Sequence, residues 1–175
     1  MKKALCKVAL ICVLLPSVSI AQDNATEQKL QKAGYLLSIE SIRLKIIRTD
    51  LSKIKKKNIV INGLDNSQIF HITLLIENIF LIETICAYES LLLKTLDNLE
   101  GNKKLEQYNF HYTRLKESTL ERLYLNYKST IANIANLEDK DILQSAYKAK
   151  EKMLKVLQEI EKIITLLKNQ IRSTH

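Results

Sequence analysis

Turn-forming residues are scarce in this sequence, which has three glycines, one proline and no tryptophan among its 175 residues. Tight turns and β-hairpins rely on glycine and proline, so this scarcity argues against a sandwich or barrel built from many short strands. The composition, 46% hydrophobic and 26% charged, is typical of a foldable soluble protein. It argues against both a disordered chain and a membrane protein with many spans. We therefore predict an all-α fold.

Motifs for catalysis and metal binding are also missing. There is no His-Glu-x-x-His, no Cys-x-x-Cys, no glycine-rich phosphate loop and no Gly-x-Ser-x-Gly elbow. Dimetal sites in helical bundles use a glutamate three residues before a histidine, which neither His71 nor His111 has. We interpret His71 as a hydrogen-bonded core or rim residue and His111 as part of an aromatic packing cluster. The sequence thus predicts no catalytic residue, no metal, no cofactor and no small-molecule substrate, and the protein is not expected to be an enzyme.

Residues 1–21 have the pattern of a signal peptide. A lysine-rich start precedes the uncharged apolar segment Val8–Leu15, and the small residues Ser19 and Ala21 stand at the two positions that signal peptidase recognises. The apolar segment is far shorter than the roughly 20 residues of a membrane span, which disfavours an uncleaved anchor. We predict cleavage before Gln22 and export to the bacterial periplasm or the exterior.

Cleavage leaves one domain, residues 22–175, with a single cysteine. Cys6 and Cys12 belong to the predicted signal peptide, and lipidation is disfavoured because Ile11, which is not a small residue, precedes Cys12. Cys86 therefore has no intrachain partner in an oxidising compartment. Its apolar neighbours predict a buried side chain, and the alternative is an intermolecular disulfide or a catalytic thiol, each of which would need exposure.

Evenly spaced breaks divide this domain into four long segments. The breaks lie at Gly63, Gly101 and Asn136, and at Gly63 and Asn136 we expect a left-handed residue, then a leucine, then an acid that begins the next helix. Short connections favour antiparallel neighbours, so the sequence predicts an up-down-up-down four-helix bundle. The predicted helices are residues 26–58, 66–100, 103–135 and 139–172.

Apolar periodicity supports a bundle with coiled-coil-like packing. The last segment has a heptad seam that includes Ile160 and Leu167, and the first segment has two apolar stripes, the second of which includes Ile42 and Ile46. Helices with two stripes contact two neighbours. The residues that we place in the core as representatives are Ile47, Ile76, Ile160 and Leu167.

The second segment differs from the others because apolar residues occupy every side of it from 69 to 82. Three interpretations are open: a buried core helix, a helix whose outer face meets a partner or a second subunit, and a transmembrane span. The span is disfavoured because Glu77 and Glu83, among other polar residues, interrupt the stretch and an interior glutamate is costly in lipid.

Basic residues cluster between Arg43 and Lys57, where seven bases accompany only Asp50. Cations near a helix C-terminus interact favourably with the helix dipole, which is one explanation. The other is a docking patch for an acidic partner or an anionic envelope surface. The predicted partner-binding residues are Arg48, Lys53, Lys55, Lys56, Lys57 and Phe70.

Together these features predict an exported, non-enzymatic protein that acts by protein-protein interaction. An immunity or inhibitor protein, a chaperone and a component of a secretion apparatus all fit the description. The alternative is a helical protein that is membrane-active or binds the envelope surface without spanning it. The expected partner is another protein, an acidic one in the docking hypothesis, or a second copy in a homodimer, and nucleic acid is not expected.

Overall fold

The computed structural model describes the backbone of residues 2–61 and 63–173 and the side chains of residues 25–60, 63–96 and 98–173. Within these ranges every regular element is helical and there is no strand. The all-α prediction with four long helices is thereby confirmed. The elements are α1 (Lys2–Ile61), α2 (Asn66–Thr95), the 3₁₀ turn η1 (Leu96–Asn98), α3 (Gly101–Arg114), the π-helical turn η2 (Leu115–Thr119), α4 (Leu120–Ile134) and α5 (Lys140–Ser173).

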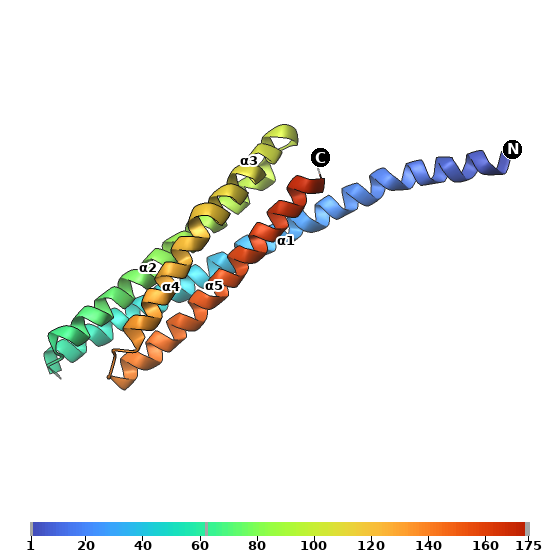
Figure 1. Cartoon of the computed structure of the whole chain (residues 1–175). Helices are drawn as coiled ribbons and strands as arrows, with labels where there is room; N and C mark the ends of the chain where they lie inside the picture. The colour runs from blue at the N-terminus through green and yellow to red at the C-terminus, as the bar shows by residue number, and fades with distance from the viewer. Residues whose placement is uncertain (1, 62, 174–175) are drawn as a thin grey trace.

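Four helical rods pack side by side, because α3, η2 and α4 follow one another without a break (Figure 1). Helix α1 packs against α2 and α5, and α4 packs against the same two helices, so each rod has two main neighbours. The start of α1 extends beyond the bundle (Figure 1). The side chains of the predicted signal peptide, residues 1–21, lie outside the described ones, so that prediction stays open.

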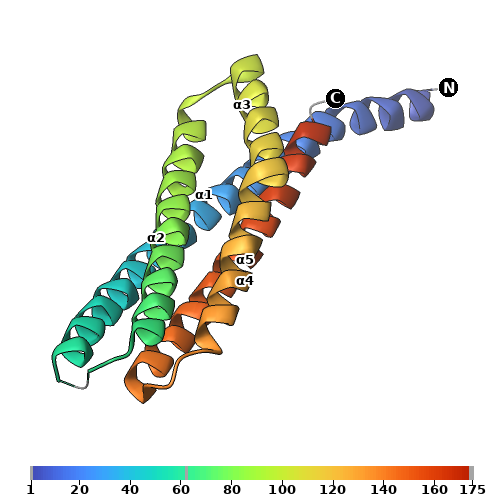
Figure 2. The same ribbon diagram turned by 60° about the vertical axis from the view of Figure 1, so that its left-hand side comes forward.

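Side-chain hydrogen bonds set the register between neighbouring helices. Lys55 Nζ of α1 donates to Thr73 Oγ1 of α2 at 2.6 Å, and Ser41 Oγ donates to the carbonyl oxygen of Glu83 at 3.1 Å. The later of the two α1 residues, Lys55, contacts the earlier of the two α2 residues, Thr73, so these two helices are antiparallel. Figure 2 shows α2 beside the α3–α4 rod, to which it is joined at one end.

The core runs the length of the bundle and is mostly aliphatic. Ile160 and Leu167 are fully buried, as predicted, whereas Ile47 and Ile76 lie half-buried at the edge of the core. Cys86 is buried, which confirms the first interpretation of this residue. Burial raises the pKa of its thiol, and the charges of Glu40, Glu89 and Glu83 add to the shift.

The second apolar stripe of α1 departs from the prediction. Ile42 and Ile46 face solvent with exposed fractions of 59% and 56%, although a two-stripe helix was expected to bury both stripes. The neighbours α2 and α5 cover one broad side of α1 and leave this stripe outside. Periodicity identifies an apolar face, but the number of neighbours decides whether that face is covered.

The two predicted helix corners differ in their backbone. Gly63 has a φ of +60°, the left-handed conformation expected there, and Asp65 caps α2 by accepting a hydrogen bond from the Gln68 amide at 2.7 Å. Asn136 does not have a positive φ, so the prediction was wrong at that position. Asp139 caps α5 by accepting from the amide of Ile142 at 2.9 Å.

Two boundaries also differ from the prediction. Helix α1 begins at Lys2, and the segment expected as one regular helix over 103–135 contains the π-helical turn η2 in its middle. A π turn accommodates one residue more than a regular turn. Sequence periodicity over so short a stretch does not distinguish the two.

Candidate functional site

Catalytic and metal-binding geometry was sought first among the described side chains. No group of three or more histidine, cysteine, aspartate or glutamate residues there could hold a metal ion. His71 Nδ1 lies 3.0 Å from Asn133 Oδ1, in keeping with a hydrogen-bonded rim residue. His111 is buried, and this burial, with the nearby charge of Arg114, lowers its pKa from 6.5 to about 4. It is therefore neutral at pH 7.

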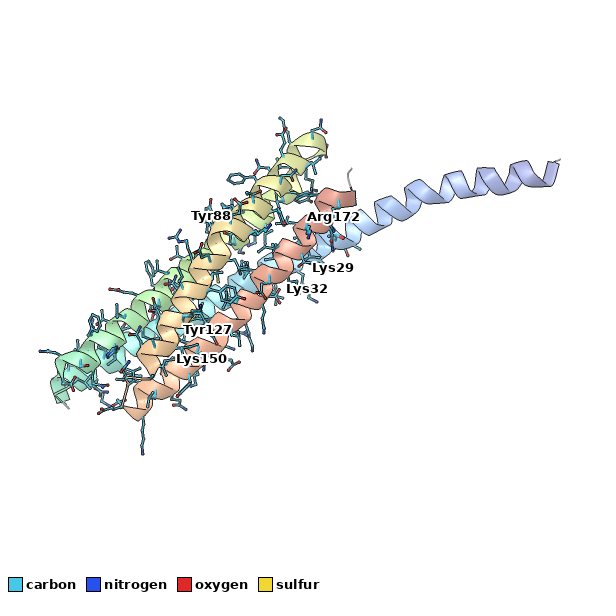
Figure 3. The ribbon with its side chains drawn as sticks, in the orientation of Figure 1. Lys29, Lys32, Tyr88, Tyr127, Lys150 and Arg172 are labelled. Atoms are coloured by element: carbon cyan, nitrogen blue, oxygen red, sulfur yellow. The ribbon has the colours of Figure 1, made fainter. Side chains whose placement is uncertain are left out.

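The outer face of α2 is the most unusual surface of the molecule. It consists of five large apolar side chains that are between 42% and 61% exposed: Phe70, Phe80, Leu81, Tyr88 and Leu91. At roughly 100° per residue, Phe70, Leu81 and Tyr88 fall within about 20° of one another around the helix. Phe80 and Leu91 lie together about 80° to one side. Tyr88 is labelled in Figure 3.

The buried side of α2 is mainly apolar, with Ile72, Leu75, Ile79, Ile82, Cys86 and Leu93, but it also includes the polar residues Gln68, Asn78, Glu89 and Ser90. Gln68 Nε2 donates to the carbonyl oxygen of Asn136 at 2.8 Å, and Asn78 Nδ2 donates to Ser129 Oγ at 2.9 Å. These bonds satisfy polar groups that would otherwise be costly to bury. Helix α2 therefore carries apolar side chains on both its buried and its exposed sides, with four polar residues among the buried ones.

Two arginines cover parts of this face from the neighbouring helices. The Arg48 guanidinium of α1 lies 5.0 Å from the centre of the Phe80 ring and donates to Glu83 at 2.7 Å. Arg114 lies 5.1 Å from the centre of the Tyr88 ring and is ion-paired with the buried Glu89. Cations stacked on aromatic rings hold those rings in place at the solvent boundary.

The predicted docking residues fall into two groups. Lys53, Lys56 and Lys57 are exposed, and none of them makes an ion pair within the described part of the chain. Lys55 is instead bonded to Thr73, and Arg48 is held by Glu83 and Phe80.

Phe70, the predicted apolar docking residue, is 57% exposed, and its ring contacts His71 edge to face at 5.5 Å. The Lys55–Thr73 bond brings the lysine-rich end of α1 beside the first turns of α2, where Phe70 lies. The structure thus groups the three exposed lysines and Phe70 at one end of the bundle.

Two hollows flank the outer face of α2. On the α1 side, an open groove of about 400 Å³ is lined by the small residues Ser38, Ser41 and Ala87 together with the exposed Ile42 and Leu91. On the other side, a pocket of about 250 Å³ lies between α2 and the η2–α4 segment. Helices of another protein can pack into hollows of this kind on either side of an apolar ridge.

Sequence reasoning missed most of this surface. It selected Phe70 but not Phe80, Tyr88 or Leu91, although the all-round apolar character of 69–82 was the signal for a helix with more apolar surface than a core needs. Arg114 was missed as well, because its importance comes from a buried partner on another helix.

By length and composition alone, one helix with described side chains, α2, could cross a membrane. About a third of its most apolar stretch is buried in the bundle. A core helix of a soluble protein passes the same test, so this property by itself is weak evidence.

Comparison of the chain with known proteins gave no match to a family model, to a curated protein or to a solved structure. Function therefore has to follow from the geometry of the described residues.

Proposed function

We propose that this protein is an exported, non-enzymatic bundle with up-down-up-down helix order that binds another protein through the outer face of α2. The observation that supports the proposal most is that α2 is apolar on its solvent side as well as on its buried side, with Phe80, Tyr88 and others exposed. Folding of the monomer gains nothing from aromatic rings in water. Several large exposed apolar side chains on one side of a helix are typical of an interaction site.

The composition of the patch matches that of a protein interface. Aromatic residues and arginine are the side chains that contribute most binding energy in interfaces, and here Arg48 and Arg114 stack on Phe80 and Tyr88. Stacking restrains the rings before a partner arrives, which reduces the entropy lost on binding.

The exposed lysines at the end of α1 suit an acidic partner. Long-range attraction between unlike charges speeds encounter, whereas buried apolar contacts supply most of the affinity. Replacing Lys53, Lys56 and Lys57 by glutamate should therefore slow association and weaken its dependence on salt while the fold stays intact. Lys55 is left unchanged in this variant because it is bonded to Thr73 of α2.

Site-specific photo-crosslinking in cells tests the proposed face directly. A photoreactive phenylalanine analogue at position 88 should give a discrete adduct with a second protein, whereas the same analogue at 147 should not. Tyr147 on α5 is the matched control, since it is a tyrosine with 55% exposure outside the α2 face. Equal adducts at both positions would contradict the proposal, and an adduct of twice the protein mass would identify a second copy as the partner.

Export is tested separately by mass spectrometry of the N-terminus. Protein from the periplasmic fraction should begin at Gln22, because the basic start, apolar segment and small residues occur in the order that signal peptidase requires. An intact N-terminus in the cytosol would contradict this part of the proposal. An immunity protein, a chaperone and a secretion component all remain within the proposed class, and the gene of the crosslinked partner distinguishes them.

A second candidate function is binding to a membrane surface, favoured by the length and apolar composition of α2. Its outer face would then meet lipid, with the lysines at the end of α1 near anionic headgroups. Co-sedimentation with vesicles containing anionic lipid tests this alternative. Binding that is lost in a Phe80→Ser, Leu91→Ser variant would favour lipid over a protein partner.

A further inference from the structure

The pocket between α2 and the η2–α4 segment brings several polar groups together. It encloses about 250 Å³, and its lining includes Thr119, Arg114 and Arg122 beside the apolar Leu81 and Ile85. A volume of this size admits a group of a few heavy atoms rather than a large cofactor.

The π-helical turn η2 places the two arginines on one side of their helix. Over the eight residues from Arg114 to Arg122, a regular α-helix would turn two full circles and about 80° more. A π turn is equivalent to one inserted residue, so the interval here corresponds to seven regular residues, or nearly two whole turns. Both side chains therefore line the same pocket. Such turns often occur at functional sites.

Not every donor in the pocket has a partner. Thr119 is only 6% exposed as a residue and lines the pocket, although its hydroxyl oxygen is not one of the buried atoms without a partner. The Arg114 Nε is buried without a partner, while its Nη2 holds Glu89. Arg122 makes no ion pair within the same set of residues, although it is exposed and lines the pocket. Buried polar groups are normally paired, so the unpaired Arg114 Nε indicates a missing acceptor.

The charge of the lining selects the kind of acceptor. Two arginine cations stand against one carboxylate, Glu89, which leaves the pocket with a single positive charge. A monoanion balances it, whereas a phosphate dianion would be in excess. The planar guanidinium fork matches a carboxylate, and Leu81, Ile85 and the Tyr88 ring provide apolar walls.

We propose that the pocket between α2 and α4 is a binding site for a carboxylate carried on a short apolar stem. Arg122 supplies the principal charge-assisted hydrogen bonds, Thr119 donates its hydroxyl, and the apolar walls receive the stem. The site follows from the pocket's own residues and holds whether or not a protein binds the outer face of α2.

Titration with sodium butyrate, followed by nuclear magnetic resonance, tests the site on the full mature chain. The arginine Nε–H signals and the Thr119 amide should shift saturably, beyond any shift caused by sodium chloride at equal ionic strength. Arg122→Gln should weaken binding about tenfold or more, because a hydrogen bond to a charged group is lost. Arg122→Lys should weaken it less, since it keeps the charge but loses the fork.

Arg172→Gln is the matched control, since Arg172 is an exposed arginine at the far end of α5 (Figure 3) and should leave the titration unchanged. Thr119→Val keeps the shape of the side chain and should also weaken binding. Shifts that grow linearly without saturation, or that are equal in Arg122→Gln and Arg172→Gln, would overturn the proposal.

Two further probes identify the source of the carboxylate and test its selection. A capped tripeptide with one central glutamate should bind at least as tightly as butyrate if the natural group is a side chain of a partner. Weaker peptide binding supports a free short-chain acid. Inorganic phosphate should bind more weakly than either probe, and equal binding of phosphate would overturn selection of a monoanion.

Discussion

Helices α2 and α5 both run the length of the bundle, yet they present different side chains to solvent. In α5 the buried residues are apolar except for Gln170, and the solvent side carries lysine and glutamate pairs such as Lys155–Glu151 and Lys162–Glu159. In α2 most of the buried residues are also apolar, but Gln68, Asn78, Glu89 and Ser90 are buried among them. Its solvent side is aromatic and aliphatic.

The comparison separates what folding requires from what it does not. Helix α5 is the amphipathic helix that a bundle needs, since its apolar seam supplies hydrophobic stabilisation and its charged side keeps it in water. Helix α2 gives up part of that gain by burying polar groups and exposing rings. Features that do not help a monomer to fold are expected at functional sites, which is the argument for the outer face of α2 as a binding surface.

The largest effect is expected from breaking the buried ion pair of α2. Arg114→Met should lower the free energy of unfolding by about 3–5 kcal/mol, because Glu89 is left buried without its partner. Combining it with Glu89→Leu should recover most of the loss. Urea denaturation followed by circular dichroism measures both, and a double variant as unstable as the single one would show that the pair is not what stabilises this region.

Truncating a buried side chain of α5 and an exposed one tests which side of this helix faces the core. Ile160→Ala should cost about 2–5 kcal/mol, since the side chain is fully buried and its removal leaves a cavity. Leu154→Ala on the same helix is the control, because Leu154 is 42% exposed and should lose far less. Similar losses in thermal denaturation for both variants would contradict the assigned face of α5.

Acid should destabilise the polar side of the interior. His111 has a folded pKa of about 4, below its usual 6.5, so between these values the unfolded chain binds more protons than the folded one. Stability should therefore fall as the pH drops from about 6.5 to 4. His111→Gln should flatten this part of the stability profile and leave the slope above pH 7 unchanged, and an equally steep profile in the variant would refute the assignment.

The smallest effect on stability is expected on the outer face of α2, where the effect on binding should be largest. Changing Phe80, Tyr88 and Leu91 to serine should lower the free energy of unfolding by about 1 kcal/mol per site, less than a core truncation, because each side chain is already half exposed. The same variant should lose its crosslinked partner. Tyr147→Ser with Leu154→Ser is the matched pair on α5, and loss of the partner in that variant instead would place the binding surface on α5.

Much of the fold was predictable because it depends on local chemistry. Scarce glycine and proline, the breaks at Gly63 and Gly101 and the heptad seam through Ile160 and Leu167 predicted four long helices and part of the core. The prediction of a left-handed backbone conformation was correct at Gly63, where no side chain opposes it. The same prediction was wrong at Asn136, where a side chain makes the left-handed conformation less favourable.

The candidate site was predictable only in outline. The sequence showed a second helix with apolar residues all round and a basic cluster before it, and it selected Phe70 and Lys53, which are exposed. It also selected Arg48 as a docking cation, but Arg48 is held by Glu83 and stacked on Phe80. The Arg48–Glu83 pair joins residues 35 positions apart in the chain, a separation that no local sequence pattern reveals.

The sequence by itself determined the helical class, the number of long helices and an excess of apolar surface on α2, because each follows from composition and from the period of a single helix. Only the tertiary structure decided which side of α2 faces solvent, that Glu89 finds Arg114, and that a π turn aligns Arg114 with Arg122 around a pocket. The physical reason is that burial is a property of pairs of helices. A side chain is inside or outside according to what its neighbours cover, and the polar groups of α2 could be buried only because partners on other helices were in place to receive them.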